Sequence, residues 1–243
     1  MKLGNDVRGA FAFLSMLPAW EDSVNWDQPG RFYAWFPLVG LVIGLLVALV
    51  ASVQFLPPDL TAFLALLTWV ALTGGLHLDG VGDSADGLLA SVEPARRLEI
   101  MKDSRAGSWA VIALILLLLG KYLGLRTVSP LLLIAPPVVA RWVLVLATVS
   151  FPYARKEGMG GMFRAGLGRS QVIIATLLTL IIVGVLAIWA APVVLLAPLL
   201  GLVVCYGGGR WATGRIGGLT GDVYGALAEV TELVCLIALG LSW

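Results

Sequence analysis

The chain has 243 residues, of which 59% are hydrophobic and 13% are charged, and its formal net charge is +1. Soluble domains carry about 25% charged residues, so this composition excludes an ordinary soluble domain. The near-neutral charge provides no bulk attraction to nucleic acid, and we expect no nucleic-acid partner. Because the apolar residues form long uninterrupted runs, the sequence predicts an all-α, polytopic integral membrane helix bundle whose partner is the lipid bilayer.

The N-terminal stretch 5–17 has apolar residues at helical spacing but is short and interrupted, which predicts an interfacial helix rather than a span. Seven later stretches are apolar enough to cross a membrane. They are 32–56, 60–78, 108–125, 131–150, 171–190, 192–206 and 224–242. Because the sixth stretch is short, we expect six or seven transmembrane helices in one membrane-embedded domain over residues 1–243.

The basic residues predict the orientation, because loops rich in Lys and Arg stay in the cytoplasm. With the N-terminus inside, 13 of the 16 Lys and Arg residues fall in cytoplasmic segments. Lys121 and Arg126 fall near the outer end of the third span, and Arg141 lies within the fourth. We therefore expect a cytoplasmic N-terminus.

Three aspartates, Asp79, Asp83 and Asp86, are spaced i, i+4 and i+7 where the second span ends. If the helix continues there, they share one face, and like charges so placed destabilise a helix. A cation between them removes that cost. Carboxylates combined with substrate phosphate oxygens are ligands that Mg²⁺ prefers, so the pattern predicts a magnesium site. The alternative is a solvated acidic helix end, and His77 is expected to be a structural residue.

The same loop continues with a short surface helix that begins near Pro94 and ends in the charged stretch 102–107. Lys102 and Arg105 are candidates for binding phosphate oxygens. Asp103 is a candidate fourth metal ligand or catalytic base. The positive-inside rule alone explains the two cations equally well.

Two further loops contribute candidates for substrate binding. One pairs Arg155 and Lys156 with glycines, a composition suited to an anionic or nucleotide group. The other contains Arg215 and enters the last span, where Asp222 and Glu229 lie at i, i+7 on one helix face. Glu229 is then an intramembrane carboxylate, and such residues usually face a cavity or a partner.

These residues predict the chemistry by their type. The single histidine and the lack of a Gly-x-Ser-x-Gly turn exclude a nucleophilic triad, and there is no Walker-type loop. What remains is metal-assisted transfer of a phosphate-linked group at a cytoplasm-facing cavity, with one carboxylate deprotonating an acceptor hydroxyl. The candidate catalytic residues are Asp79, Asp83, Asp86 and Asp103.

Three segments carry a resemblance: GGLHLDGVGDSADG at 74–87, IMKDSRAG at 100–107 and RIGGLTGD at 215–222. In this order they resemble the cobalamin synthase family, the adenosylcobinamide-GDP ribazoletransferases, over nearly the whole chain. The resemblance implies a Mg²⁺-dependent enzyme of the bacterial or archaeal cytoplasmic (inner) membrane, with its active site on the cytoplasmic side. It also implies the reaction, in which adenosylcobinamide-GDP and α-ribazole or its 5′-phosphate give adenosylcobalamin or its phosphate and GMP.

The same resemblance implies the partners and the chemical step. The ribazole 3′-hydroxyl attacks the cobinamide-linked phosphorus, and GMP leaves. A homo-oligomer and contacts with other cobamide-assembly enzymes are compatible with this nucleotide-loop assembly step. The chain departs from the family at Met16, where the family commonly has Arg.

Two other functions compete with this interpretation. The segment 83–91 also resembles the start of the CDP-alcohol phosphotransferase motif, but Ser91 stands where that family has Arg. An ion-coupled transporter would use intramembrane carboxylates such as Glu229, placed in paired repeats near mid-membrane. The sequence shows no internal repeat, and its aspartates cluster at one membrane face.

Overall fold

The computed structural model describes residues 2–18, 24–155 and 164–241, and most of these residues are helical. The α-helices are α1 (Lys2–Leu14), α2 (Phe36–Ala51), α3 (Pro58–Thr73), α4 (Leu76–Leu89), α5 (Pro94–Ile100), α6 (Ser108–Thr127), α7 (Ala135–Ser150), α9 (Arg169–Trp189), α10 (Leu196–Ile216) and α11 (Gly221–Gly240). Short 3-10 helices precede α2, α7 and α10: η2 (Pro29–Trp35), η3 (Pro130–Ile134) and η4 (Pro192–Leu195).

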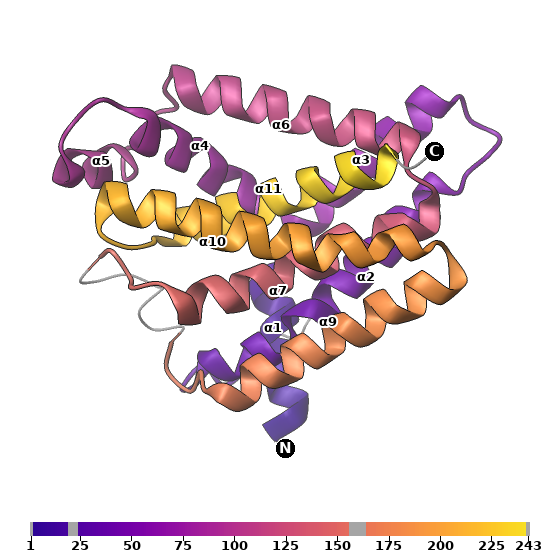
Figure 1. Cartoon of the computed structure of the whole chain (residues 1–243), viewed down its shortest axis with the longest axis horizontal. Helices are drawn as coiled ribbons and strands as arrows, with labels where there is room; N and C mark the ends of the chain where they lie inside the picture. Colours follow the sequence, from indigo (N-terminus) through magenta and orange to yellow (C-terminus); the bar gives the residue numbers. More distant parts are fainter. Residues whose placement is uncertain (1, 19–23, 156–163, 242–243) are drawn as a thin grey trace.

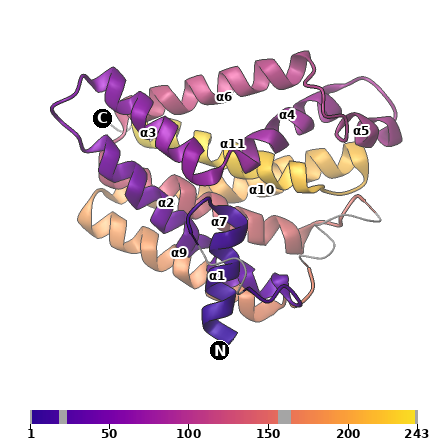
Figure 2. The same ribbon diagram turned by 180° about the vertical axis from the view of Figure 1, so that it is seen from behind.

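Helix α7 is the centre of the bundle, and residues 135–148 are all buried. It packs against α2, α9, α10 and α11 (Figures 1 and 2). Helix α11 in turn packs against α4 and α6, which form the other side of the molecule. Apolar composition alone does not explain this place, because α9 is more apolar and is mostly unburied. Helix α7 carries the buried Arg141, and a charge within a membrane span needs protein partners rather than lipid.

The prediction of a polytopic helical membrane protein is confirmed. Six helical segments in the described residues are long and apolar enough to cross a membrane, and a seventh is obtained if the bent pair α3 and α4 counts as one span. The six segments are Pro29–Ala51, Ser108–Thr127, Pro130–Ser150, Arg169–Trp189, Pro192–Ile216 and Gly221–Gly240.

The predicted second span is wrong as a continuous helix over 60–78. Helix α3 ends at Thr73, α4 begins at Leu76, and the two axes are bent by 89°. Gly74 and Gly75 form the break with φ angles of +61° and +68°. This left-handed conformation is open to glycine but costs other residues about 1–2 kcal/mol, so the glycine pair allows the chain to turn here. The turn gives the three aspartates a helix of their own.

The predicted sixth span, 192–206, is too short. Helix α10 continues to Ile216, ten residues beyond the end of the apolar run. Arg210 lies 5.9 Å from the Tyr206 ring and Arg215 lies 4.7 Å from the Trp211 ring. Arginine is among the better helix formers, so these basic residues do not end the helix. The charged residues Arg210 and Arg215 therefore end the apolar run but not the helix.

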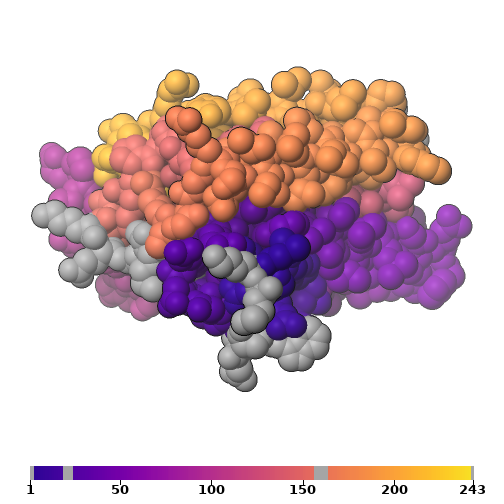
Figure 3. Space-filling view, turned by 90° about the horizontal axis from the view of Figure 1, so that it is seen from below, coloured from indigo at the N-terminus to yellow at the C-terminus, as the bar shows by residue number. Residues whose placement is uncertain are grey.

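The predicted N-terminal helix is present as α1. Its Leu14 is buried in the bundle, and its Asp6 carboxylate pairs with Arg31 at 2.7 Å. The space-filling view shows the indigo N-terminal segment on one face of the molecule, below the orange α9 (Figure 3). A place at the membrane interface remains a prediction for this helix.

Helices α4 and α11 approach closely at a glycine. A Cβ on Gly80 would lie 2.6 Å from the backbone oxygen of Asp222, whereas a Cβ on Gly82 would lie 3.4 Å from the Ala110 methyl group. We expect Gly80→Ala to lower the free energy of unfolding by about 1–3 kcal/mol, because backbone cannot yield as a side chain does. Gly82→Ala is the matched control on the same helix.

Equilibrium unfolding in detergent micelles measures both variants. The control is expected to be neutral or slightly stabilising, because alanine favours a helix interior by up to about 1 kcal/mol over glycine. Equal stability of the two variants would contradict the close approach of α4 and α11.

Candidate functional site

The three sequence segments singled out above meet at one end of the bundle, which we call the site end. Figure 1 shows the end of α4, the helix α5 and the start of α6 together at its left side. The first segment contacts the second through Asp86, which accepts a hydrogen bond from Gly107 N at 2.6 Å. The third segment reaches the same helix through Arg215, which donates to Leu88 O at 2.7 Å.

Asp86 caps helix α6 from the neighbouring helix α4. Its Oδ2 accepts from Gly107 N, and its Oδ1 accepts from Ala110 N at 3.0 Å. The first amides of a helix have no partner within the helix, and the dipole favours a negative charge there. Both oxygens of Asp86 thus accept hydrogen bonds from the start of α6, and its predicted roles as metal ligand and catalytic residue remain predictions.

This contact predicts a cost in stability. We expect Asp86→Ala to lower the free energy of unfolding by about 1–2 kcal/mol, the usual cost of losing a helix cap. The exposed Asp79, two turns earlier on α4, supplies the comparison. Asp79→Ala should not lower stability, and a loss equal to that of Asp86→Ala would show that Asp86 is no cap. Thermal unfolding of both variants in detergent makes the comparison.

Asp83 lies among other carboxylates. It interacts electrostatically with Asp222, Asp79 and Asp86, and Arg155 is the cation in this group. Arg155 Nη2 donates to Asp222 Oδ2 at 2.9 Å, so these two predicted substrate-binding residues form an ion pair. Asp222 stands in the first turn of α11, and Thr220 caps that helix by accepting from Val223 N at 3.3 Å. The cluster therefore joins α4 to the start of α11.

Two arginines bind the carboxyl end of α4. Arg97 Nη1 donates to Leu88 O at 2.6 Å and to Gly87 O at 3.2 Å. Arg215 donates to the same Leu88 oxygen. The last carbonyls of a helix carry partial negative charge, which cations satisfy. Arg215 thus holds the end of the helix that carries the aspartates.

The predicted phosphate-binding stretch lies on the surface beside α5. Arg105 donates to both oxygens of Asp103, at 3.0 and 2.7 Å, and Lys102 is exposed. The Arg105 guanidinium lowers the pKa of Asp103 to about 2. A carboxylate with so low a pKa is a weak general base, because the best base has a pKa near the working pH. Lys156 lies outside the described residues.

Among the described residues, no three His, Cys, Asp or Glu side chains converge on a point that could hold a metal ion. The donor set nevertheless suits Mg²⁺, which commonly takes one or two carboxylates and completes its shell with water and substrate phosphate oxygens. Asp79, Asp83 and Asp222 are hard oxygen donors at the site end. Asp83 and Asp86 also lie in the carboxyl-terminal half of α4, where the helix dipole adds negative charge. Magnesium at this cluster remains a prediction.

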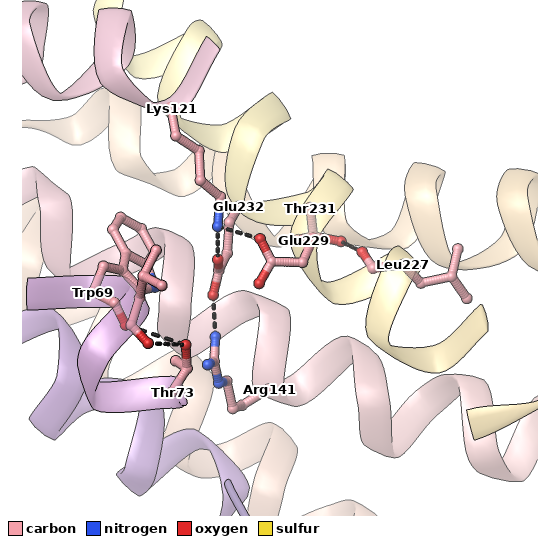
Figure 4. Close-up of polar contacts among 9 residues, drawn as sticks. Trp69, Thr73, Lys121, Arg141, Leu227, Glu229, Thr231 and Glu232 are labelled. Atoms are coloured by element: carbon pink, nitrogen blue, oxygen red, sulfur yellow. Dashed lines mark hydrogen bonds and ion pairs between the residues drawn. The ribbon is translucent and has the colours of Figure 1, made fainter. Parts of the chain in front are cut away.

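Glu229 lies deeper, in a buried charge cluster of four side chains: Lys121, Arg141, Glu229 and Glu232. Lys121 reaches from α6 to both glutamates of α11, and Arg141 reaches Glu232 from α7 (Figure 4). All four are buried, and Lys121 also lies 4.7 Å from the Trp69 ring. The Lys121 side chain therefore lies inside the helix bundle and is not exposed at the surface of the protein. A substrate-binding role for Glu229 remains a prediction, and the structure gives its carboxylate a partner on α6.

Comparison with known proteins decides the family. The family model described as "Cobalamin-5-phosphate synthase" matches residues 6–240. The chain belongs to the cobalamin-5-phosphate synthase family. It is 40% identical over 240 residues to the adenosylcobinamide-GDP ribazoletransferase of Stutzerimonas stutzeri (strain A1501), covering 96% of each chain. No solved structure matches the chain.

Further relatives carry the same name. The adenosylcobinamide-GDP ribazoletransferase of Synechococcus sp. is 36% identical over 98% of this chain and 96% of its own. That of Desulforamulus reducens is 36% identical over 97% of each chain. The cobalamin-5-phosphate synthase family is thus shown over nearly the full length, which agrees with the resemblance in the three segments. The two competing functions, a CDP-alcohol phosphotransferase and an ion-coupled transporter, are not favoured by these relatives.

Several residues that contact the site end or form the buried charge cluster were not predicted from the sequence. Arg97 at the end of α4, and Arg96 and Glu99 of α5, gave no motif signal of their own. The charge cluster did have a signal, because Arg141 and Glu229 both stand in apolar spans and buried membrane charges usually pair. Counting Lys121 only as an orientation signal near the outer end of the third span concealed the partner of Glu229.

Proposed function

We propose that this protein joins adenosylcobinamide-GDP to α-ribazole or its 5′-phosphate, releasing GMP. One observation carries the proposal beyond family membership: the segments 74–87, 100–107 and 215–222, far apart in sequence, lie together at the site end. The juxtaposition supplies carboxylates beside cations in a membrane-embedded protein. That combination suits transfer of a phosphate-linked group from a charged donor.

The residues support a single displacement at phosphorus. A carboxylate of the cluster Asp79, Asp83 and Asp222 accepts the proton of the ribazole 3′-hydroxyl. The hydroxyl oxygen bonds to the cobinamide-linked phosphorus, the bond from that phosphorus to the GMP oxygen breaks, and GMP leaves with the electron pair. Arg155, which pairs with Asp222, and the exposed Lys102 and Arg105 orient the phosphates.

We propose that two carboxylates of the cluster Asp79, Asp83 and Asp222 hold Mg²⁺ when substrate is present, which leaves the third to accept the proton. When bound, the ion neutralises charge on the donor phosphates. The crowding of like charges around Asp83 supports this assignment, because a cation relieves the repulsion. The two oxygens of Asp86 serve α6, so Asp86 fixes the geometry of the cluster.

We further propose that the site end faces the cytoplasm, in the bacterial or archaeal inner membrane. The distribution of Lys and Arg supports this orientation, because the basic residues around Arg97, Arg155 and Arg215 gather at that end. A cytoplasmic site also meets substrates that carry phosphates and cannot cross a bilayer unaided.

Expression in a bacterium that lacks its own ribazoletransferase tests the function in cells. The wild-type chain is expected to restore cobalamin-dependent growth on cobinamide. Failure to restore growth, with the protein present in the membrane fraction, would contradict the proposal. Restored growth by an Asp83→Asn variant at equal abundance would instead show that Asp83 is not required for the reaction.

A further inference from the structure

A pocket of about 390 Å³ opens at the site end between α5 and the segment that leads to α6. Arg96, Glu99 and Ile100 line it from α5, Asp103 and Arg105 line it from the segment, and Asp86 stands at its border with the carboxylate cluster. Ligand pockets for small molecules have volumes of about 300–1,000 Å³, so this pocket is in the range for one. It is too small for a corrin ring with its amide side chains.

Most of the residues that line the pocket are charged, which selects among the remaining parts of the substrates. The base of α-ribazole is a dimethylated benzimidazole without donors on its carbon edge, and Ile100 is the one large apolar side chain in the lining. Guanine presents N–H donors beside its O6 and N7 acceptors. A carboxylate accepts from such donors, and an arginine donates to O6 and N7.

Arg96 and Glu99 provide this pair of groups one helical turn apart. Arg96 Nη1 donates to Glu99 Oε2 at 2.7 Å, and both side chains are exposed. An exposed ion pair contributes little to stability. The hydrogen bond between Arg96 and Glu99 can therefore be replaced by hydrogen bonds to a ligand at a small cost in free energy.

Arg105 provides the matching group for a phosphate. Its side chain is 87% exposed and holds Asp103 through two hydrogen bonds. A guanidinium binds phosphate oxygens in the same forked geometry, and the exposed pair with Asp103 is exchanged cheaply. The charge of Asp86 at the border is offset by the amides of Gly107 and Ala110.

We propose that this pocket, which we call the α5 pocket, binds the guanosine monophosphate part of the donor, an inference that rests on the proposed function. Glu99 and Arg96 recognise the guanine edge, and Arg105 holds the phosphate. The leaving GMP therefore departs at α5, beside Asp86 and next to the carboxylate cluster. The corrin part of the donor lies outside the α5 pocket.

Binding of labelled GMP to the purified full chain, by equilibrium dialysis in detergent, tests the proposal without requiring turnover. We expect GMP to bind about 10-fold or more tightly than AMP, because hydrogen bonds to a charged group discriminate by that much. Glu99→Gln is expected to remove the preference, and Arg105→Ala is expected to weaken both nucleotides alike. Glu93→Gln, at the exposed start of α5 and outside the lining, is the matched control and should leave both affinities unchanged.

The outcomes separate this proposal from the proposed function. Equal affinity of the wild type for GMP and AMP, or an unchanged preference in Glu99→Gln, overturns the α5 pocket as the guanine site. If the wild type also converts adenosylcobinamide-GDP, the proposed function survives that result. If GMP binds as expected but no conversion occurs, the α5 pocket stands and the proposed reaction fails.

Discussion

Asp83→Asn is expected to lower the transfer rate by about 100-fold or more, the usual cost of removing one preorganised charged group from an active site. Asp83 interacts with Asp79, Asp86 and Asp222, and Arg155 is the cation among them. The amide keeps the shape of the side chain but loses the negative charge that binds a cation or accepts a proton. The variant therefore tests the charge of this position and not its packing.

The same substitution should not destabilise the fold. Like charges close together repel one another, so removing one of the four carboxylates leaves stability unchanged or raises it. Turnover is measured on purified protein, and thermal unfolding is measured in parallel. Asp27→Asn, an exposed aspartate in the N-terminal loop, is the control for loss of one negative charge. Near-normal turnover in Asp83→Asn would exclude Asp83 from the reaction.

Glu232→Gln is expected to lower the free energy of unfolding by about 3–5 kcal/mol, the typical cost of breaking a buried ion pair from one side. Glu232 joins Lys121 to Arg141, and all three side chains are buried in the bundle. The amide leaves Arg141 with an uncompensated charge in a membrane-spanning helix. Because Lys121 retains Glu229, the loss arises mainly at Arg141.

A double-mutant cycle isolates this pair. Arg141→Met combined with Glu232→Gln should lose less stability than the two single variants together, by about 0.5–3 kcal/mol, because residues in direct contact are coupled. Equilibrium unfolding in detergent measures all variants. Asp59→Asn breaks the exposed pair with Arg126 and should cost less than about 1 kcal/mol. Additive losses within the cycle would show that Glu232 and Arg141 do not depend on each other.

The apolar runs predicted most of the helices, and the exceptions have local causes. The run over 60–78 contains no Asp, Glu, Lys or Arg, yet two glycines in left-handed conformation turn the chain after Thr73. Hydropathy does not register this turn, because glycine is neither strongly apolar nor charged. The helix from Leu196 continues past its apolar part, because Arg210 and Arg215 end the apolar run but are good helix formers.

The candidate site was predictable in residue type and less so in contacts. The spacing of Asp79, Asp83 and Asp86 predicted that they share a helix, and all three lie on α4. The capping of α6 by Asp86 depends on how two helices pack, which spacing within one segment does not encode. The same limit applies to Arg155 with Asp222, since these residues are 67 positions apart.

The proposed reaction and its metal dependence are tested most directly with detergent-purified protein, adenosylcobinamide-GDP and α-ribazole. Mass spectrometry follows GMP and the cobalamin product, once with Mg²⁺ and once with EDTA. We predict both products in equal amounts with Mg²⁺ and neither with EDTA, with activity restored when Mg²⁺ is returned. Absence of both products from folded protein with Mg²⁺ would contradict the proposed reaction, and full activity in EDTA would contradict the metal-dependent carboxylate cluster.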